Sequence, residues 1–291
     1  MSVVHSCGGQ WRIAYTLAVV ICILVCFSGT ALPGSSGEPA TKQADHPRPW
    51  IMVGLSPDGC PGGCRHLRSV ICEMSGNRNV VTLDFKTATF EMISDLDPEF
   101  MVLSPQGTPW CRYTGSNGVA LQNFLWLIPQ IAEELDVPIL GICGGHQAIA
   151  LAFGGKVGPI RSGIDDCMPY SRERQSGVTQ LSQKARDPIF IGLDDKIRIV
   201  ESHYDEVKEL PPGFVLLASE KISRNQIIRH PYKPIYGIHG HPESFLGSRP
   251  DGGTLLRNFI HIADSYNKNV RYVSKDRQIN MSFNKLTKYV K

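Results

Sequence analysis

One cysteine in this 291-residue chain stands where a thiol can act as a nucleophile. Cys143 follows the apolar run 137–142, and glycines occupy positions 141, 144 and 145 around it. Glycines permit the tight turn that lifts a nucleophile clear of a sheet, and the helix N-terminus that follows favours a thiolate. The sequence therefore predicts a nucleophile elbow with sulfur as the attacking atom. The alternative is a buried structural cysteine at a helix start.

A thiolate nucleophile needs a base, and the base needs a group that orients it. His241 and Glu243 flank Pro242, directly after the apolar run 234–238. The proline stiffens the backbone between the two side chains, so the imidazole and the carboxylate are expected at a fixed mutual angle. These residues predict a catalytic triad of Cys143, His241 and Glu243.

The elements around these residues alternate between strand and helix. Apolar runs predict strands at 50–55, 79–85, 99–105 and 137–142, and a helical spacing of apolar residues predicts helices at 63–74, 118–136, 145–155 and 252–264. This alternation predicts an α/β fold with a mostly parallel sheet and helices on both faces. Beyond residue 155 the strand-like runs have no long helix between them, which predicts a small antiparallel extension. Ligands of such sheets bind at the carboxyl ends of the strands, where Cys143 lies.

The motifs GICGGHQ and GIHGHPE together resemble those of the class I (triad) glutamine amidotransferase family. The resemblance covers about residues 48 to 264. It implies a flavodoxin-like α/β domain in which Cys143 attacks the side-chain amide of glutamine. A γ-glutamyl thioester then forms and ammonia is released, with His241 as the base and Glu243 as its orienting group.

The resemblance also implies residues that bind the substrate and the oxyanion. Gln147 matches the family glutamine that contacts the substrate, and Ser202 and His203 match a pair that holds the α-substituents of glutamine in the GMP-synthetase branch. The family's oxyanion loop typically reads S-P-G-P-G-x-P, whereas this chain has LSPQGTPW, with one glycine and one residue fewer. We expect the backbone N–H groups of Gly107 and Gly144 to face the developing negative charge.

Three functions stay open at this stage. The residues of the two motifs favour glutamine hydrolysis. The ammonia would then pass to a separate synthetase, because the chain has no ATP-binding glycine loop. A secretory location favours the γ-glutamyl hydrolase branch of the same superfamily, whose substrates are γ-glutamyl peptides. The charged segment 162–177 would then form a wall of the site, with Arg172 and Arg174 facing the carboxylate of a second residue. The third function is a non-catalytic binding module on the same fold.

The N-terminus resembles a secretory signal. Arg12 precedes an uncharged apolar run, and small residues follow at 28–31, so residues 1–31 are expected to be a signal peptide. An uncleaved signal anchor is the alternative, since the run approaches the roughly 20 residues that span a bilayer. The expected location is the secretory pathway, where the protein is either secreted or anchored by this segment. Any contact with a membrane is expected only through the same segment. A flexible linker is expected over 32–47, the folded domain over 48–267 and a basic polar tail over 268–291.

Charge and cysteine usage limit the remaining classes. A net charge of +3, with no basic run interleaved with aromatic residues, argues against a nucleic-acid partner. In an oxidising compartment up to two disulfides can form among five cysteines, and for the two in CPGGC at 60–64 we expect free thiols or one local disulfide. These five are Cys60, Cys64, Cys72, Cys111 and Cys167. No cofactor is expected, and no further ligands complete a zinc site around CPGGC at 60–64.

Overall fold

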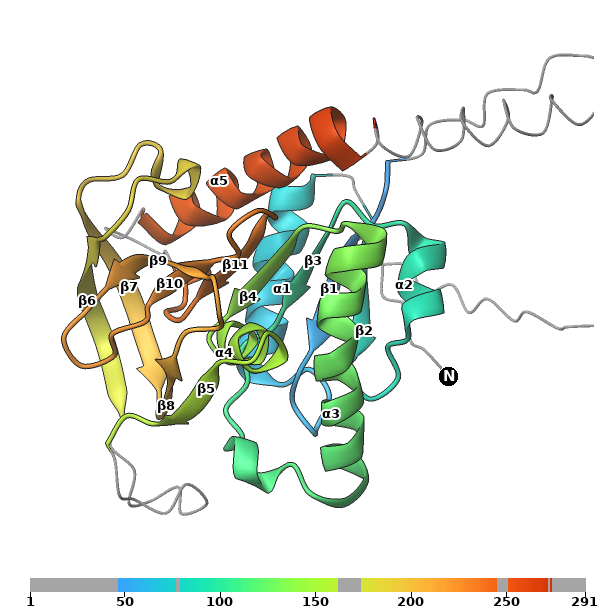
Figure 1. Ribbon diagram of the computed structural model, residues 1–291, viewed down its shortest axis with the longest axis horizontal. Coiled ribbons are helices and arrows are strands. Elements are labelled where there is room, and N and C mark those ends of the chain that lie inside the picture. Colours follow the sequence, from blue (N-terminus) through green and yellow to red (C-terminus); the bar gives the residue numbers. More distant parts are fainter. Residues whose placement is uncertain (1–46, 77–78, 162–173, 245–250, 272, 274–291) are drawn as a thin grey trace, which may run out of the picture.

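The computed structural model describes residues 47–76, 79–161, 174–244, 251–271 and 273. The predicted signal, Cys167, Arg172 and the tail from residue 274 lie outside these residues. Within the described part, nine strands form one sheet in the order β2-β1-β3-β4-β11-β10-β9-β6-β7, and β5 and β8 form a second sheet (Figure 1). The strands are β1 Trp50–Gly54, β2 Val80–Asp84, β3 Phe100–Leu103, β4 Ile139–Ile142, β5 Lys156–Pro159, β6 Gln175–Gln183, β7 Lys196–His203, β8 Asp205–Glu209, β9 Val215–Ser219, β10 Ile227–Arg229 and β11 Ile235–Ile238.

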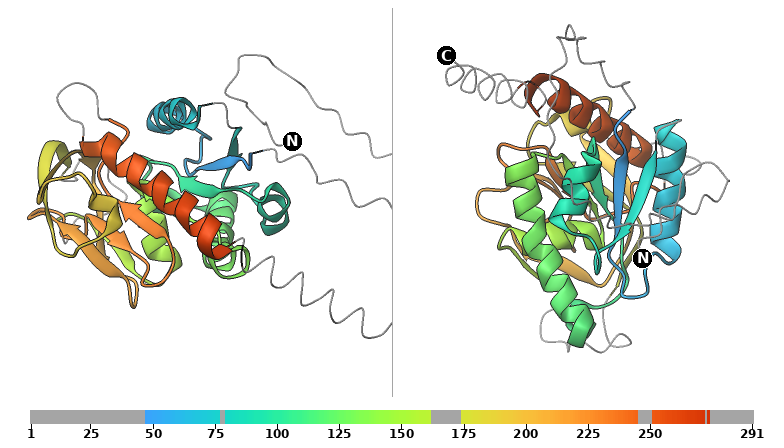
Figure 2. Two further views of the ribbon diagram at one scale, coloured as in Figure 1. Left: turned by 90° about the horizontal axis from the view of Figure 1, so that it is seen from above. Right: turned by 90° about the vertical axis from the view of Figure 1, so that its right-hand side faces the viewer.

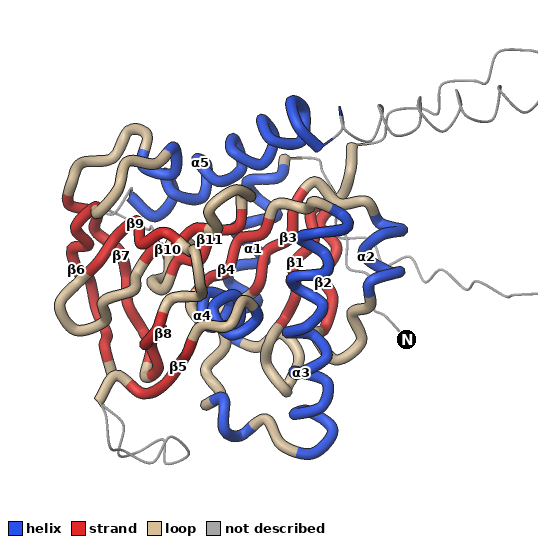
Figure 3. Tube along the Cα trace, viewed as in Figure 1, coloured by secondary structure: helices blue, strands red, loops and turns tan. Residues whose placement is uncertain are grey.

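The strand order explains the predicted change of pattern after residue 155. Strands β2, β1, β3, β4 and β11 pair in parallel, which is the flavodoxin-like order, so the predicted α/β fold is confirmed. From β11 outward, β10, β9, β6 and β7 pair antiparallel. The antiparallel extension therefore continues the same sheet, and Figure 3 shows its strands at the end of the sheet far from α2.

The helices divide the core into two layers, one on each face of the sheet. They are α1 Gly62–Ser75, α2 Phe90–Leu96, α3 Gly115–Gln130, α4 Gly144–Ala152 and α5 Asp251–Tyr266. Along β1, Trp50 and Met52 face the core shared with α1 and α5, whereas Ile51 and Val53 face the core shared with α2, α3 and α4. This alternation is what a strand buried on both faces requires. The right-hand view of Figure 2 shows α1 and α3 on opposite sides of the parallel strands.

Three elements were not expected from the sequence. Helix α2 has seven residues and starts after Thr89, whose Oγ1 accepts a hydrogen bond from the Met92 N–H at 3.2 Å. Strands β5 and β8 pair with each other outside the large sheet. These elements are too short to show a clear period in the sequence.

The C-terminal helix is followed by a π-helical turn, Asn267–Arg271, which crosses the expected domain boundary at residue 267. Arg271 is buried and donates hydrogen bonds to the carbonyl oxygens of Leu135, at 2.9 Å, and Pro98, at 2.6 Å. This arginine therefore packs with the domain. Of the helices in the described residues, none is both long and apolar enough to cross a membrane.

Candidate active site

Cys143 occupies the corner between β4 and α4. It is only 3% exposed, and its backbone φ of +50° is unusual for a residue other than glycine. Such a conformation costs on the order of 1–3 kcal/mol and is concentrated at functional sites. The Cys143 N–H donates to the carbonyl oxygen of Ile238 at 2.9 Å, so the corner is fixed to the end of the neighbouring strand β11. The geometry is that of the predicted elbow.

The glycines of the elbow are required by close backbone packing. A Cβ atom on Gly145 would lie 2.2 Å from the carbonyl oxygen of Leu103, and one on Gly141 would lie 2.3 Å from the carbonyl oxygen of Gly145. A Cβ atom on Gly144 would lie 2.4 Å from Cγ of Gln106. These distances are far below van der Waals contact, so the first turn of α4 can rest on β3 and β4 only if these positions lack side chains.

His241 and Glu243 lie beyond the end of β11, next to the elbow. Strands β4 and β11 pair in parallel, and Ile142 is opposite Ile238. The Nδ1 atom of His241 is 2.8 Å from Oε1 of Glu243, whose side chain is 1% exposed. The structure thus brings the three predicted triad residues to one edge of the sheet.

The electrostatics of His241 point to Cys143. Burial lowers the pKa of His241, but the charge and hydrogen bond of Cys143, together with those of Glu243, outweigh it and raise that pKa well above 6.5. Because Nδ1 of His241 bonds Glu243, Nε2 of His241 is the nitrogen that can face the Cys143 thiol. This Nε2 atom has no other hydrogen-bond partner among the described residues. This arrangement favours the protonated, imidazolium form of His241 beside Cys143.

A buried group that the sequence did not single out lies behind this pair. Glu201 is 1% exposed, its Oε2 is 2.8 Å from Nε2 of His203, and the His203 ring packs on His239 with centroids 3.5 Å apart. Burial raises the pKa of Glu201, whereas the charge of nearby His241 acts in the opposite direction. The alternating positions 201 and 203 in ESHYDEV were the one sequence signal for an inward-facing pair.

Side-chain donors of Glu201, His203 and His239 lie within 4.8 Å of one another, a spacing that a metal ion could use. Both nitrogens of His239 already have partners, however. Nδ1 is 3.1 Å from Oγ of Ser223, and Nε2 is 3.0 Å from the carbonyl oxygen of Asp205. The donor set therefore fits a hydrogen-bonded cluster better than a metal centre, which needs its histidine nitrogens free.

The residues expected to bind substrate fall into different environments. The side chain of Gln147 is buried, accepts from Nε1 of Trp110 at 2.6 Å and donates to the carbonyl oxygen of Asp205 at 2.8 Å. Ser202 Oγ accepts from Nη2 of Arg174 at 2.6 Å, whereas His203 is buried with Glu201. Since neighbouring residues of a strand point to opposite faces, Ser202 and His203 are not brought together.

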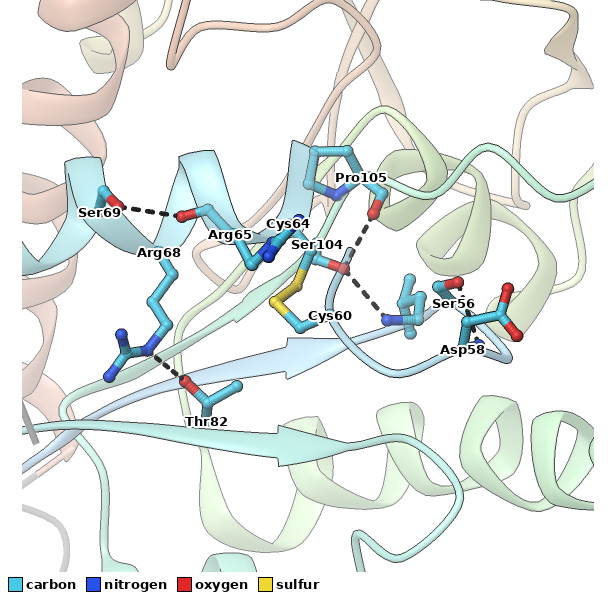
Figure 4. The surroundings of a disulfide bond; sticks show 11 residues. Ser56, Asp58, Cys60, Cys64, Arg65, Arg68, Ser69, Thr82, Ser104 and Pro105 are labelled. Carbon is cyan, nitrogen blue, oxygen red and sulfur yellow. Dashed lines mark hydrogen bonds between the residues drawn. A yellow bond between two sulfur atoms is a disulfide. The ribbon is translucent and has the colours of Figure 1, made fainter. Parts of the chain in front are cut away.

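The oxyanion loop, which we define as residues 104–110, follows β3 and reaches the elbow. Gln106 packs against Gly144, while Gly107 is exposed and has open space around its Cα. At the start of the loop, Ser104 Oγ accepts from the Leu55 N–H at 3.1 Å and donates to the Pro105 carbonyl oxygen at 3.0 Å (Figure 4). The loop is therefore in contact with the nucleophile elbow, although it contains a single glycine.

Four of the described cysteines are in disulfides, and one of the bonds is the local disulfide expected as an alternative to free thiols in CPGGC. Cys60 and Cys64 are joined, with Cα atoms 5.1 Å apart, beside the start of the oxyanion loop (Figure 4). Cys72 and Cys111 are disulfide-bonded as well. Among the described cysteines, Cys143 alone is a free thiol. The free thiol is thus the one at the elbow.

Comparisons with known proteins point to one family. Residues 67–263 match the family described as glutamine amidotransferase class-I. A glutamine-hydrolyzing GMP synthase subunit of Pyrococcus abyssi is 37% identical over 176 residues, which are 60% of this chain and 81% of the relative. The corresponding subunit of Methanosarcina acetivorans is 43% identical over 136 residues, which are 46% of this chain and 64% of the relative.

Solved structures show the same architecture. A protein of Thermoplasma acidophilum assigned as a GMP synthase subunit is similar with a TM-score of 0.58 and 27% identity, over 77% of this chain and 97% of that one. A glutamine amidotransferase from Thermotoga maritima, with 16% identity and a TM-score of 0.52, shares the fold over 77% of this chain and 85% of its own.

Proposed function

Because the chain belongs to the class I glutamine amidotransferase family, we propose that it hydrolyses the side-chain amide of glutamine with Cys143 as nucleophile and His241 as base. One observation carries the proposal. Strands β4 and β11 end side by side, and the residues that follow them are a free thiol in a strained turn and a histidine bonded to buried Glu243 at 2.8 Å. A nucleophile, a base and an orienting group in this order are the parts that covalent amide hydrolysis needs.

The proposed reaction has two halves. The Cys143 thiolate attacks the side-chain carbonyl carbon of glutamine, and backbone N–H groups of Gly144 and of Gly107 in the oxyanion loop stabilise the oxyanion. His241 gives its Nε2 proton to the departing nitrogen, so ammonia leaves and a γ-glutamyl thioester remains. His241 then takes a proton from water, which attacks the thioester and releases glutamate and the free thiol. Glu243 holds the imidazole in the tautomer that both steps need.

The proposed substrate contacts follow the same geometry. Gln147 is one helical turn beyond Cys143, and its N–H donates to the Cys143 carbonyl oxygen at 3.1 Å. Its side chain contacts the substrate, in this proposal, by exchanging its bond to the Asp205 carbonyl oxygen. Ser202 and Arg174 together hold the α-substituents of glutamine. His203 has an indirect role, because its ring packs on His239, which in turn lies 3.2 Å from the side-chain nitrogen of Gln147.

A separate synthetase is the proposed acceptor of the ammonia. The relatives from Pyrococcus abyssi and Methanosarcina acetivorans are subunits by name, and their names describe glutamine hydrolysis within a GMP synthase. The proposal therefore assigns the amination step to another chain.

The second candidate, hydrolysis of γ-glutamyl peptides, has one specific observation in its favour. Four of the described cysteines are in disulfides, and disulfides persist in oxidising compartments, away from cytosolic biosynthesis. Such a location suits a stand-alone hydrolase. The same observation supports our proposal that residues 1–31 direct the chain into the secretory pathway as a signal peptide or anchor.

A substrate panel separates the two reactions. The purified chain is given glutamine, γ-glutamyl dipeptides and poly-γ-glutamate at millimolar concentration, and ammonia and amino acid release are measured, with Cys143→Ala as the control. Ammonia release from glutamine that vanishes in Cys143→Ala supports the first proposal. Cleavage of the peptides with glutamine inert would establish the second. Inertness toward all of them would favour the non-catalytic module.

The proposed location needs its own experiment. The full chain is expressed in a eukaryotic cell, and its culture medium, membranes and cytosol are assayed by immunoblot under reducing and non-reducing conditions. We expect the protein in the medium or in the lumen of membrane vesicles, with faster migration when the disulfides are intact. A reduced protein confined to the cytosol would contradict the proposal.

A further inference from the structure

A buried tyrosine hydroxyl lies at the centre of the contacts that hold the oxyanion loop. Tyr113 follows the loop in sequence and is 7% exposed. Its Oη donates to the carbonyl oxygen of Leu55, at the end of β1, over 2.6 Å and lies 3.2 Å from Oε1 of Gln106. The side chain of Thr108 also hydrogen-bonds Tyr113. The hydroxyl thus contacts the residues on both sides of Gly107.

The chemistry of this hydroxyl suits a fixed hydrogen-bonding centre. Burial raises the pKa of Tyr113, so the hydroxyl keeps its proton across the physiological range and donates to Leu55. The hydroxyl directs its single proton toward two acceptors, the carbonyl oxygen of Leu55 and Oε1 of Gln106, and it accepts a hydrogen bond from the side chain of Thr108. A buried centre of this kind restrains each partner, because a partner that leaves it forfeits about 1 kcal/mol or more.

A second contact ties the same tyrosine to the nucleophile helix. The rings of Trp110 and Tyr113 are stacked, with centroids 5.5 Å apart and an interplanar angle of 27°. Nε1 of Trp110 donates to Oε1 of Gln147 in α4 at 2.6 Å. The loop is therefore fastened at one end to β1, through Leu55, and at the other to the helix that begins after Cys143.

We propose that Tyr113 is a positioning residue for amide hydrolysis, which holds the single-glycine oxyanion loop against Gly144 through Gln106 and Thr108. The inference rests on the proposed function. An oxyanion hole is effective only if its donors are fixed before the reaction, and displacements well below 1 Å weaken it. Around Gly107 the loop lacks the close backbone packing that fixes the elbow, and the tyrosine supplies the missing restraint.

The test compares Tyr113→Phe with Tyr236→Phe. Tyr236 is also buried, at 3% exposure, and its hydroxyl bonds Asp187 at 3.0 Å, but its ring packs in the core on the other face of the sheet. Both variants therefore lose one buried tyrosine hydroxyl. Amide hydrogen exchange of the peptide that spans residues 104–112 is measured in the wild type and both variants, along with kcat, KM and thermal stability.

In Tyr113→Phe we expect exchange in this peptide to be about tenfold faster and kcat to fall by about 10- to 100-fold, with KM within about twofold. Removal of an oxyanion donor outright costs about 10²–10³-fold, so loss of its positioning should cost less. The rate of Cys143 alkylation by iodoacetamide should be unchanged, because that reaction forms no oxyanion. Tyr236→Phe should leave exchange in the loop and kcat unchanged, even where it lowers thermal stability.

Two outcomes would overturn the inference. One is unchanged exchange in the loop of Tyr113→Phe, and the other is an equal loss of kcat in both variants, which would make the effect one of general stability. If the wild type does not release ammonia from glutamine, the proposed function fails, and the exchange measurement still decides whether Tyr113 holds the loop.

Discussion

The nucleophile elbow, residues 141–147, and the oxyanion loop, residues 104–110, lie side by side but are held by different forces. In the elbow, backbone packs on backbone, and a Cβ atom on Gly141 or Gly145 would lie within 2.3 Å of a carbonyl oxygen. In the loop, the one glycine, Gly107, has open space around it, and side chains of Tyr113 and Trp110 make the restraining contacts.

The difference shows two ways to fix a functional turn. Close packing of glycines leaves the elbow no alternative conformation, because the surrounding strands are themselves buried on both faces. Hydrogen bonds to a buried side chain fix the loop through interactions that can be removed one at a time. Substitutions in the elbow and its partner strand should therefore have much larger effects than substitutions around the loop.

The largest effect is expected for the base that faces the elbow. His241→Ala should lower kcat by on the order of 10⁵-fold or more, because the base moves the proton. The loss of kcat in Glu243→Gln should be smaller by about tenfold or more, because Glu243 only sets the tautomer of the histidine. Steady-state kinetics with glutamine measure both. Circular dichroism and thermal melting of the two variants serve as the control for folding. Equal losses, or a larger loss at Glu243, would show that the two residues have been assigned the wrong functions.

Two glycine substitutions test the comparison directly. Gly145→Ala places a Cβ atom 2.2 Å from the Leu103 carbonyl oxygen and should lower the free energy of unfolding by more than about 4 kcal/mol, a loss reserved for severe core disruption. Gly107→Ala meets no atom within 4 Å and should change it by less than about 0.5 kcal/mol, as surface substitutions do. Urea denaturation measures both. Comparable losses would mean that the loop is as tightly packed as the elbow.

The sequence predicted the elbow side of the site because its restraints are local. Glycines around Cys143, and a proline between His241 and Glu243, are readable in seven-residue motifs. Strands β1, β2, β3 and β4 of the parallel half were predicted for a similar reason, since they are continuous apolar runs between helices with a clear period. Strand β11 was expected in the antiparallel extension, because no long helix precedes it, but it pairs in parallel with β4. The structure places all three triad residues at one sheet edge.

The position of the loop was predicted, but the contacts that restrain it were not, because they connect residues that no motif links. Tyr113 reaches back to Leu55, 58 positions away, and Trp110 reaches Gln147, 37 positions away. Nothing in the sequence around a tyrosine says that its hydroxyl will be buried. The same holds for Glu201, whose pairing with His203 depends on which face of β7 turns inward.

The next effect concerns pH and follows from the groups around His241. Glu243 raises the pKa of His241, so Glu243→Gln should lower it, and the alkaline limb of kcat/KM should move to lower pH than in the wild type. The raised pKa of His241 also affects the stability of the folded protein. A raised pKa in the folded state stabilises the protein fully below the unfolded value of 6.5 and loses this contribution as pH rises through the folded value. Urea denaturation should therefore show the largest gap between variant and wild type at low pH. An alkaline limb that does not move would indicate that Glu243 does not set the charge of His241.

The smallest effect on turnover is expected for the disulfide beside the loop. Cys60 and Cys64 close a short ring next to Ser104 and Pro105, but neither cysteine contacts Tyr113 or Trp110 through any hydrogen bond found in the described residues. The double variant Cys60→Ala with Cys64→Ala should lose about 2 kcal/mol of stability, the loop-closure value for so short a ring. Its kcat should stay within about twofold of the wild type, because the tyrosine still fixes Gln106 and Thr108. Urea denaturation and steady-state kinetics on the same preparation separate the two quantities. A loss of kcat as large as that in Tyr113→Phe would mean that the disulfide, and not the tyrosine, is the main restraint on the oxyanion loop.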